Sequence, residues 1–248
     1  MSSQGETAKC HAAEFAKLVN YNVDKFRPRL QIESECMQYI DLHRDFYDTT
    51  VEYSNMAIWY ACAVIYAGYF GQDNVVLQLI ANGADINAAD SYGDSLLIVY
   101  CQQYKYDMIL KLINHGADVN TVSKYKRTAL LILCNSPPHE QQLVVVTALI
   151  NRGADVNKCD TYTPLCYALQ RGNIELAIKL INAGARFVEY LDINYVVKYP
   201  QVVNEFRHKY NESILAAMND ECPTNAFAAS FKKIYVPQLV DIITAFIL

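Results

Sequence analysis

The sequence lacks the patterns that mark most enzymes and metal proteins. It has eight cysteines among 248 residues, but no Cys-x-x-Cys pair and no histidine pair at metal-ligand spacing. It also contains no Gly-x-Ser-x-Gly, His-Glu-x-x-His or Gly-x-x-x-x-Gly-Lys motif. We therefore predict no catalytic residue, no metal site and no cofactor, and we expect that the chain is not an enzyme.

Long hydrophobic runs are also missing. The longest nearly apolar run, residues 56–70, is shorter than the ~20 residues that a membrane-spanning helix needs, and we predict a buried helix there. The N-terminus has no basic stretch followed by an apolar one, as a secretory signal would. We therefore expect a cytoplasmic protein that binds no membrane, with reduced cysteines that pack as small apolar residues.

Positive charge is in short supply. The chain has 21 Lys and Arg against 26 Asp and Glu, which gives a formal net charge of −5. Proteins that bind nucleic acids usually present a basic face, so we expect no nucleic-acid partner. Hydrophobic residues make up 52% of the chain, enough to bury a core, which argues against general disorder.

What the sequence does contain is an internal repeat. Four similar segments each place a glycine after an apolar stretch, at intervals of 33, 37 and 31 residues; these are Gly83, Gly116, Gly153 and Gly184. The first three continue as Gly-Ala-Asp-(Ile/Val)-Asn. Glycine adopts the left-handed backbone that ends many helices at the lowest cost, so we predict a helix before each of these residues.

A second motif recurs at matching offsets. Ser95, Thr128 and Thr163 each precede an apolar stretch, as N-caps do, and the last opens the sequence Thr-Pro-Leu-Cys-Tyr-Ala. These motifs resemble the ankyrin-repeat family, whose 33-residue repeat contains Thr-Pro-Leu-His-x-Ala. The resemblance covers about residues 60–187. It implies an all-α fold, an ankyrin-repeat solenoid with four recognisable repeats and helical N- and C-terminal caps.

We predict three regions along the chain. Residues 1–58 form a helical N-terminal cap region, residues 59–187 the ankyrin repeats, and residues 188–248 a degenerate repeat with a C-terminal helical cap or docking tail. Caps are expected because a solenoid exposes apolar faces at both ends. In the first region, apolar spacing predicts short helices at 11–19 and 35–42, and the charge-rich run 41–48 is interpreted as a solvated helix face.

Two departures from the period have structural consequences. The 37-residue interval contains Asn135–Glu140 with two prolines, which forbid one continuous helix. Cys101 and Cys134 occupy a position that is normally a small buried alanine, and Gly68 falls there in the first repeat. We therefore interpret both cysteines as core residues.

The resemblance implies that a partner protein is bound through hairpin fingertips and the inner-helix face. Tyr92, Tyr125 and Tyr162 each lie nine residues after a repeat glycine, so we predict an aromatic row near successive fingertips. Tyrosine offers a large contact area at little entropy cost and is favoured at interfaces. Charged neighbours would add specificity: Asp90, Asp94, Lys124, Lys126, Arg127, Lys158 and Asp160.

A second row falls at the variable site of the inner helices: Tyr66, Val99, Ile132 and Tyr167. In the family this position lines the concave groove, so the row is a second candidate for partner binding. The alternative is that a flanking segment covers the row or that the helices are rotated. The same offsets place Asn87, Asn120 and Asn157 at hairpins, where such an asparagine bonds to the backbone.

The C-terminal tail suggests a different function. Pro237 precedes apolar residues at helical spacing: Leu239, Ile242, Ile243 and Phe246. This stretch resembles the opening of an F-box-type motif, found in some ankyrin proteins of viruses and intracellular bacteria. The resemblance implies an adaptor that recruits a ubiquitin-ligase component, in a host cytoplasm if a pathogen encodes the chain. Two alternatives remain: the tail is a helix that only packs on the core, or the flanking regions contain an enzyme site.

Overall fold

The computed structural model describes residues 3–20, 29–54, 58–186 and 198–219. Contacts between residues divide the chain into two compact units, Met1–Asp160 and Thr161–Leu248, which are described separately. The predicted three-region division of the chain is a different partition and stays a prediction.

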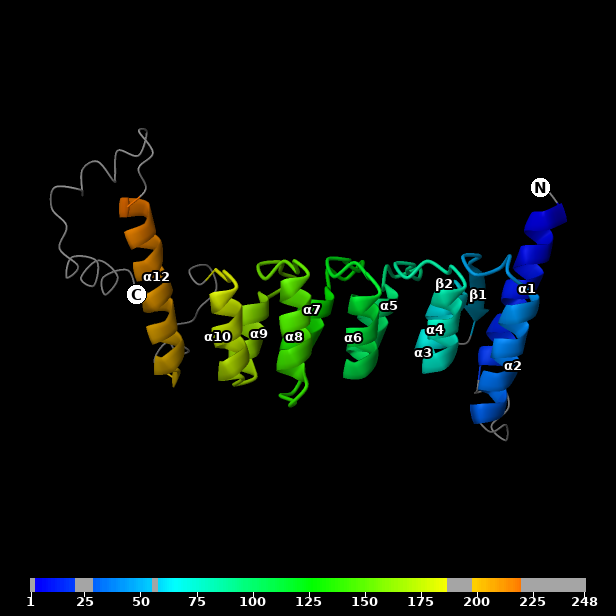
Figure 1. The fold of residues 1–248 in the computed structure, drawn as a ribbon, viewed down its shortest axis with the longest axis horizontal. Helices are drawn as coiled ribbons and strands as arrows, with labels where there is room; N and C mark the ends of the chain where they lie inside the picture. Colours follow the sequence, from blue (N-terminus) through cyan, green and yellow to red (C-terminus); the bar gives the residue numbers. More distant parts are fainter. Residues whose placement is uncertain (1–2, 21–28, 55–57, 187–197, 220–248) are drawn as a thin grey trace. The chain divides into compact units, whose positions relative to one another are not determined.

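The first unit is built from helix pairs that stack in two rows (Figure 1). The inner row contains α1 (Ser3–Val19), α3 (Ala63–Tyr69), α5 (Leu96–Gln102) and α7 (Ala129–Asn135). The outer row contains α2 (Arg29–Leu42), α4 (Asp73–Ala81), α6 (Tyr106–Asn114) and α8 (Gln142–Asn151). Each inner helix packs against the next inner helix and against its own outer partner. The predicted all-α repeat fold is confirmed.

The ends of the repeat helices follow from the recurring polar residues and glycines. Ser95 and Thr128 accept hydrogen bonds from the backbone N–H groups of Ile98 and Leu131, so both act as the predicted N-caps. The four repeat glycines all have positive φ, at 99°, 88°, 83° and 92° in chain order. That conformation ends each outer helix and starts the loop to the next repeat.

A β-hairpin precedes the first predicted repeat. Strand β1 (Val51–Ser54) pairs antiparallel with β2 (Ile58–Ala61), with Val51 opposite Ala61. The prediction of one buried helix over residues 56–70 is therefore wrong for its first part. Ile58, Trp59 and Tyr60 favour a strand, and the extended backbone of Cys62 separates the strand from α3.

The helices α1 and α2 stack on α3 and α4 as a further repeat would. Both are longer than the sequence predicts, but α2 ends at Leu42, so the interpretation of residues 41–48 as a solvated helix face is wrong. Phe46 and Tyr47 are buried, and the ring of Phe46 lies 5.0 Å from that of Phe15 on α1. Only the two aromatic side chains turn inward, because their burial is favourable, while Arg44, Asp45 and Asp48 stay exposed.

Successive loops are tied together by one recurring hydrogen bond. The side-chain oxygen of Asn87 accepts from the backbone N–H of Asp118 at 2.8 Å, and that of Asn120 accepts from Asp155 at 2.9 Å. Asp48 accepts from Asp85 in the same way at 3.2 Å, although no repeat motif surrounds it. The predicted backbone bonding is thus confirmed for both asparagines, and it extends into the segment before the repeats.

Asn120 provides a direct test of this bonding, because its amide also donates to Gly153 O at 2.9 Å. We expect Asn120→Ala to lower the free energy of unfolding by about 1–2 kcal/mol, since two inter-repeat bonds are lost in a partly hydrated site. The matched control is Asn114→Ala, at an exposed position on α6, which should change it by less than about 0.5 kcal/mol. Equal effects in urea titrations would contradict the structural role.

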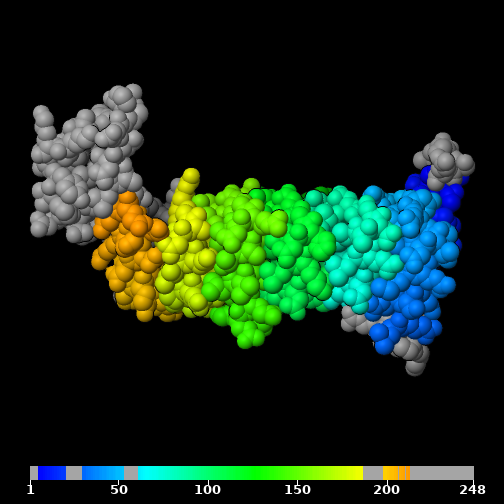
Figure 2. Space-filling view, viewed as in Figure 1, coloured from blue at the N-terminus to red at the C-terminus, as the bar shows by residue number. Residues whose placement is uncertain are grey.

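The α7–α8 connection departs from its neighbours as predicted. Helix α7 ends at Asn135 and α8 begins at Gln142, with exposed Pro137 and Pro138 between them. The added length forms a green protrusion on the surface in Figure 2. No continuous helix runs through the prolines.

The second unit contains α9 (Pro164–Gln170), α10 (Ile174–Asn182) and α12 (Pro200–Asn219). Thr163 caps α9 by accepting from Cys166 N, and Pro164 occupies the first turn, as predicted. Helix α12 packs against α10 and buries Val202 and Val203. Of the region 188–248, predicted as a degenerate repeat with a cap or tail, the structure describes residues 198–219.

Most of the described thiols lie in the core, but Cys10 and Cys159 are exposed, so the prediction that the cysteines pack as small apolar residues is wrong for these two. Cys101 and Cys134 are fully buried, and this burial raises the pKa of both thiols. Both therefore stay protonated and pack as small apolar groups, as the sequence predicts. Across the described part of the chain, no helix is long and apolar enough to span a bilayer.

Candidate functional site

The loop between α4 and α5 ends in a tight hairpin, the first fingertip (residues 90–94). The backbone N–H of Asp90 donates to Asp94 O at 3.1 Å and closes the turn. One oxygen of the Asp90 carboxylate accepts from the N–H groups of Tyr92 and Asp94, at 2.8 and 2.9 Å. The carboxylate thus holds the turn from inside and presents Tyr92 at its tip.

The loop between α6 and α7 repeats this geometry in the second fingertip (residues 123–127). Ser123 N donates to Arg127 O at 3.0 Å, and the Ser123 hydroxyl accepts from the N–H groups of Tyr125 and Arg127. Serine therefore does here what Asp90 does one repeat earlier. Both are short side chains that bond to backbone two and four residues ahead.

The two fingertips touch each other. Lys124 N donates to Tyr92 O at 2.8 Å, and the rings of Tyr92 and Tyr125 stack with centroids 6.1 Å apart and planes at 27°. Tyr125 is 58% exposed, although its ring lies beside both Tyr92 and the Arg127 guanidinium, whose Cζ is 5.1 Å from the ring centre. An exposed aromatic side chain held this firmly loses little entropy on binding.

The charged neighbours divide into two groups. Lys124 and Lys126 are exposed at the second fingertip. Asp90 and Asp94 are buried, which contradicts their prediction as charged contact residues. Their carboxylates are turned inward because the backbone and side-chain donors of the fingertips need acceptors there: Asp94 accepts from Gln102 at 2.9 Å and lies 3.6 Å from the Arg127 guanidinium.

Burial raises the pKa of Asp94 above its ordinary value of 3.8, and the Gln102 bond and the Arg127 charge offset this only in part. A carboxyl whose pKa is raised on folding stabilises the fold fully below its unfolded pKa and loses that contribution as the pH rises through its folded pKa. We therefore expect the stability of the wild type relative to Asp94→Asn to fall as the pH rises from about 4. Urea titrations over a pH series measure this difference, and a difference that rises with pH would contradict it.

The remaining predicted fingertip residues belong to the next loop. Lys158 is exposed and Asp160 is half-buried at the end of the first unit. In the second unit, Tyr162 is 41% exposed and its ring meets that of Tyr167 edge-on at 5.6 Å. Tyr162 is thus an exposed aromatic residue, as predicted, and its alignment with Tyr92 and Tyr125 stays a prediction.

The predicted row on the inner helices does not form an open apolar groove. Tyr66 and Val99 are buried, whereas Ile132 and Tyr167 are half-buried. The Tyr66 hydroxyl donates to Val51 O at 3.3 Å, so β1 covers the start of the row. This favours the alternative in which a flanking segment packs over the row, and it corrects the placement of Tyr66 and Val99 on an exposed surface.

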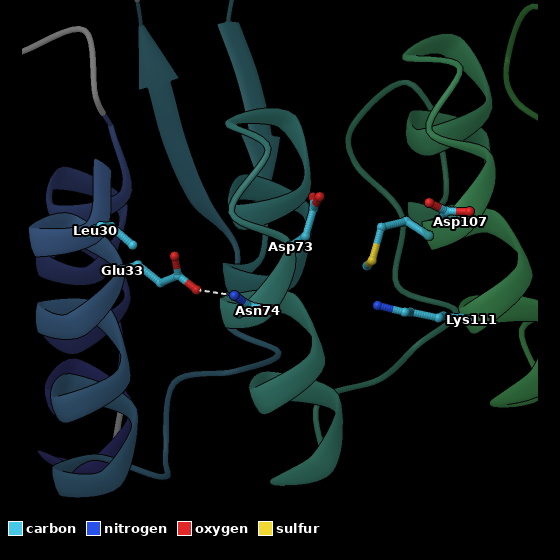
Figure 3. Close-up of a pocket in the computed structure, with 7 residues that line it drawn as sticks. Leu30, Glu33, Asp73, Asn74, Asp107 and Lys111 are labelled. Carbon is cyan, nitrogen blue, oxygen red and sulfur yellow. Dashed lines mark hydrogen bonds between the residues drawn. The ribbon is translucent and has the colours of Figure 1, made fainter. Parts of the chain in front are cut away.

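A cavity of about 400 Å³ opens on the outer row between α2, α4 and α6 (Figure 3). Two of its acidic lining residues are engaged: Glu33 accepts a hydrogen bond from the Asn74 amide, and Asp73 pairs with Lys105 at 2.7 Å. Among the residues that the structure describes, no group of His, Cys, Asp and Glu side chains is arranged to hold a metal ion. The cavity wall joins neighbouring helices through these polar contacts.

A polar cluster near the N-terminus matches none of the motifs predicted from the sequence. His11 on α1 lies with its ring 4.0 Å from that of His43, and its Nδ1 is 2.8 Å from Asp45 Oδ1. This contact lowers the pKa of Asp45. The Tyr39 hydroxyl donates to Glu14 at 2.9 Å rather than to the imidazole of His11. Tyr39 and Asp45 lie 28 and 34 positions after His11 in the sequence. No sequence motif links the three residues, so only the fold brings them together.

Paired helices in register, with each loop bonded to the next, define a tandem-repeat protein of the helix-pair type. The chain belongs to the ankyrin-repeat family: the model of this family, which spans three repeat copies, matches residues 58–158 and 97–190, together more than half of the chain. Ankyrin repeats are generally protein–protein interaction modules, and the family is typically non-enzymatic. Comparison with curated proteins finds no match.

The predicted docking residues of the tail, which lie between Leu239 and Phe246, fall outside the described residues. The F-box-like reading therefore stays a prediction from sequence, as does the origin in a pathogen.

Proposed function

We propose that this chain binds a partner protein through the two fingertips, residues 90–94 and 123–127. The observation that carries the proposal is the stacked pair of Tyr92 and Tyr125, in which Tyr125 is 58% exposed. A flexible surface tyrosine would lose rotamer freedom on binding. Here the hydrogen bonds of Asp90 and Ser123 and the contact with Arg127 have already ordered the pair.

The charges around the pair support the same surface. Lys124, Lys126 and Arg127 surround Tyr125, and the aromatic ring with an arginine beside it is the combination most often found at the energetic centre of interfaces. We propose that Lys158, Asp160 and Tyr162, in the loop that follows α8, are further contact residues for the partner. Ile132 and Tyr167 are half-buried, so both remain candidate contact residues. Tyr66 and Val99 are buried and would reach a partner only after a rearrangement.

Affinity capture followed by mass spectrometry tests this function. The wild type, the double variant Tyr92→Ala/Tyr125→Ala and the control Tyr104→Ala are compared as baits. Tyr104 is 48% exposed and lies in the α5–α6 turn, away from the fingertips, so its loss removes a similar aromatic surface elsewhere.

We expect the control to retain the wild-type partner and the double variant to lose it. A loss of 2–4 kcal/mol, typical of removing interface hot spots, corresponds to about 30- to 1,000-fold in affinity. Retention of every partner by the double variant, with unchanged circular dichroism, would refute the site.

A further inference from the structure

The second fingertip carries a lysine where the repeat geometry favours glycine. Lys126 has φ = 59°, and the matching residue of the first fingertip is Gly93 with φ = 73°. The turn is the same in both, since Gly93 N donates to Asp90 O and Lys126 N donates to Ser123 O, each at 2.9 Å. A side chain with a Cβ adopts this left-handed conformation at a cost in stability. Lysine therefore stands at a strained position that glycine would occupy at lower cost, as Tyr104 does in the α5–α6 turn.

The lysine completes a concentrated positive charge on an acidic chain. Lys124, Lys126 and Arg127 lie within four residues, while the chain as a whole carries −5. Lys124 and Lys126 are exposed and, among the described residues, neither ammonium group has a carboxylate within 4.0 Å. Arg127 differs, because Asp94 lies 3.6 Å from its guanidinium. Two exposed cations that have no carboxylate partner in the described part of the chain thus flank the ring of Tyr125.

We propose that the second fingertip binds an acidic segment of the partner protein, with carboxylates on Lys124 and Lys126 and an apolar or aromatic side chain on the Tyr125 ring. The inference rests on the proposed function and specifies its partner chemistry. Charge complementarity selects this partner: two exposed ammonium groups attract carboxylates, and the ring between them supplies contact area. A nucleic acid is disfavoured because the positive surface spans one turn and the rest of the chain would repel a phosphate backbone.

The test is a selection from a displayed library of random peptides against the full chain, followed by anisotropy titrations of a synthesised selected peptide. We expect the selected peptides to be rich in Asp and Glu, and their affinity to fall as salt is raised. Lys124→Gln/Lys126→Gln should weaken binding by at least about tenfold and flatten the salt dependence.

Two glycine variants separate strain from recognition. Lys126→Gly should raise the midpoint of thermal unfolding by about 2–4 °C and weaken peptide binding at the same time. Tyr104→Gly is the matched control, because Tyr104 also has positive φ, at 56°, and the matching residue one repeat earlier is Gly71, at 68°. It should raise the midpoint without changing the affinity.

Selected peptides without excess acidic residues, or an affinity unaffected by Lys124→Gln/Lys126→Gln, would overturn this inference. So would tighter binding of a single-stranded oligonucleotide that the same double variant abolishes. The proposed function would survive the first two results if Tyr92→Ala/Tyr125→Ala still abolished partner capture, so the failures of the two proposals are distinguishable.

Discussion

Replacing Tyr100 by alanine is expected to lower the free energy of unfolding by about 3–5 kcal/mol, as for other large buried aromatic side chains. Tyr100 is fully buried on the inner helix α5, and its hydroxyl donates to Asp73 Oδ1 on the outer helix α4 at 3.1 Å. The side chain therefore joins two successive repeats. Its removal would leave a cavity at that junction, and the Asp73 carboxylate would accept one hydrogen bond fewer.

The conservative variant separates packing from the hydrogen bond. Tyr100→Phe keeps the ring and should cost only about 1 kcal/mol, because Asp73 keeps its ion pair with Lys105 at 2.7 Å. Chemical denaturation of both variants measures the two costs. If Tyr100→Phe were as destabilising as Tyr100→Ala, the junction would depend on the polar contact rather than on packing.

Gly68→Val is expected to destabilise the fold by about 1–3 kcal/mol through overpacking between α3 and α5. A Cβ at position 68 would lie 2.6 Å from Leu96 Cδ1, and Leu96 is fully buried and has little room to move. Position 68 corresponds to Cys101 and Cys134 in the next two repeats. Cysteine is a small side chain, but it is larger than glycine. In the first repeat, α3 and α5 therefore approach too closely for a side chain larger than glycine to fit without a shift of Leu96.

The control is Gly5→Val on α1, where a Cβ meets no atom within 4 Å beyond its chain neighbours and the backbone of its own helix. The two substitutions have similar helix propensities, so their difference reports packing. Thermal unfolding should show a clear loss for Gly68→Val and little change for Gly5→Val. Similar losses in both variants would contradict close packing at Gly68.

The repeat architecture was predictable because its determinants are local. A positive φ at Gly83 or Gly116, and an N-cap at Ser95 or Thr128, depend on residues within one helix turn, so their recurrence reveals both helix ends and period. The stacking of Tyr92 on Tyr125 follows from the same recurrence, because equal offsets lead to equal environments in neighbouring repeats.

Other features depend on contacts that no local pattern encodes. The strand at Ile58–Ala61 forms because β1 lies beside it, and Val99 is buried by its neighbours rather than by its own spacing. Asp94 looks like a surface charge in the sequence and is buried because Gln102 and Arg127 reach it in the fold. Whether a carboxylate is buried thus depends on whether hydrogen-bond donors lie near it in the fold, and the sequence does not show where those donors lie.

Hydrogen–deuterium exchange of the chain with and without a captured partner tests the central claim most directly. If the fingertips form the binding surface, the partner should slow exchange of the backbone amides in residues 90–94 and 123–127, and Tyr92→Ala/Tyr125→Ala should abolish that protection. Protection confined to the outer helices around Asn74 and Lys111, with unchanged exchange at both fingertips, would contradict the account.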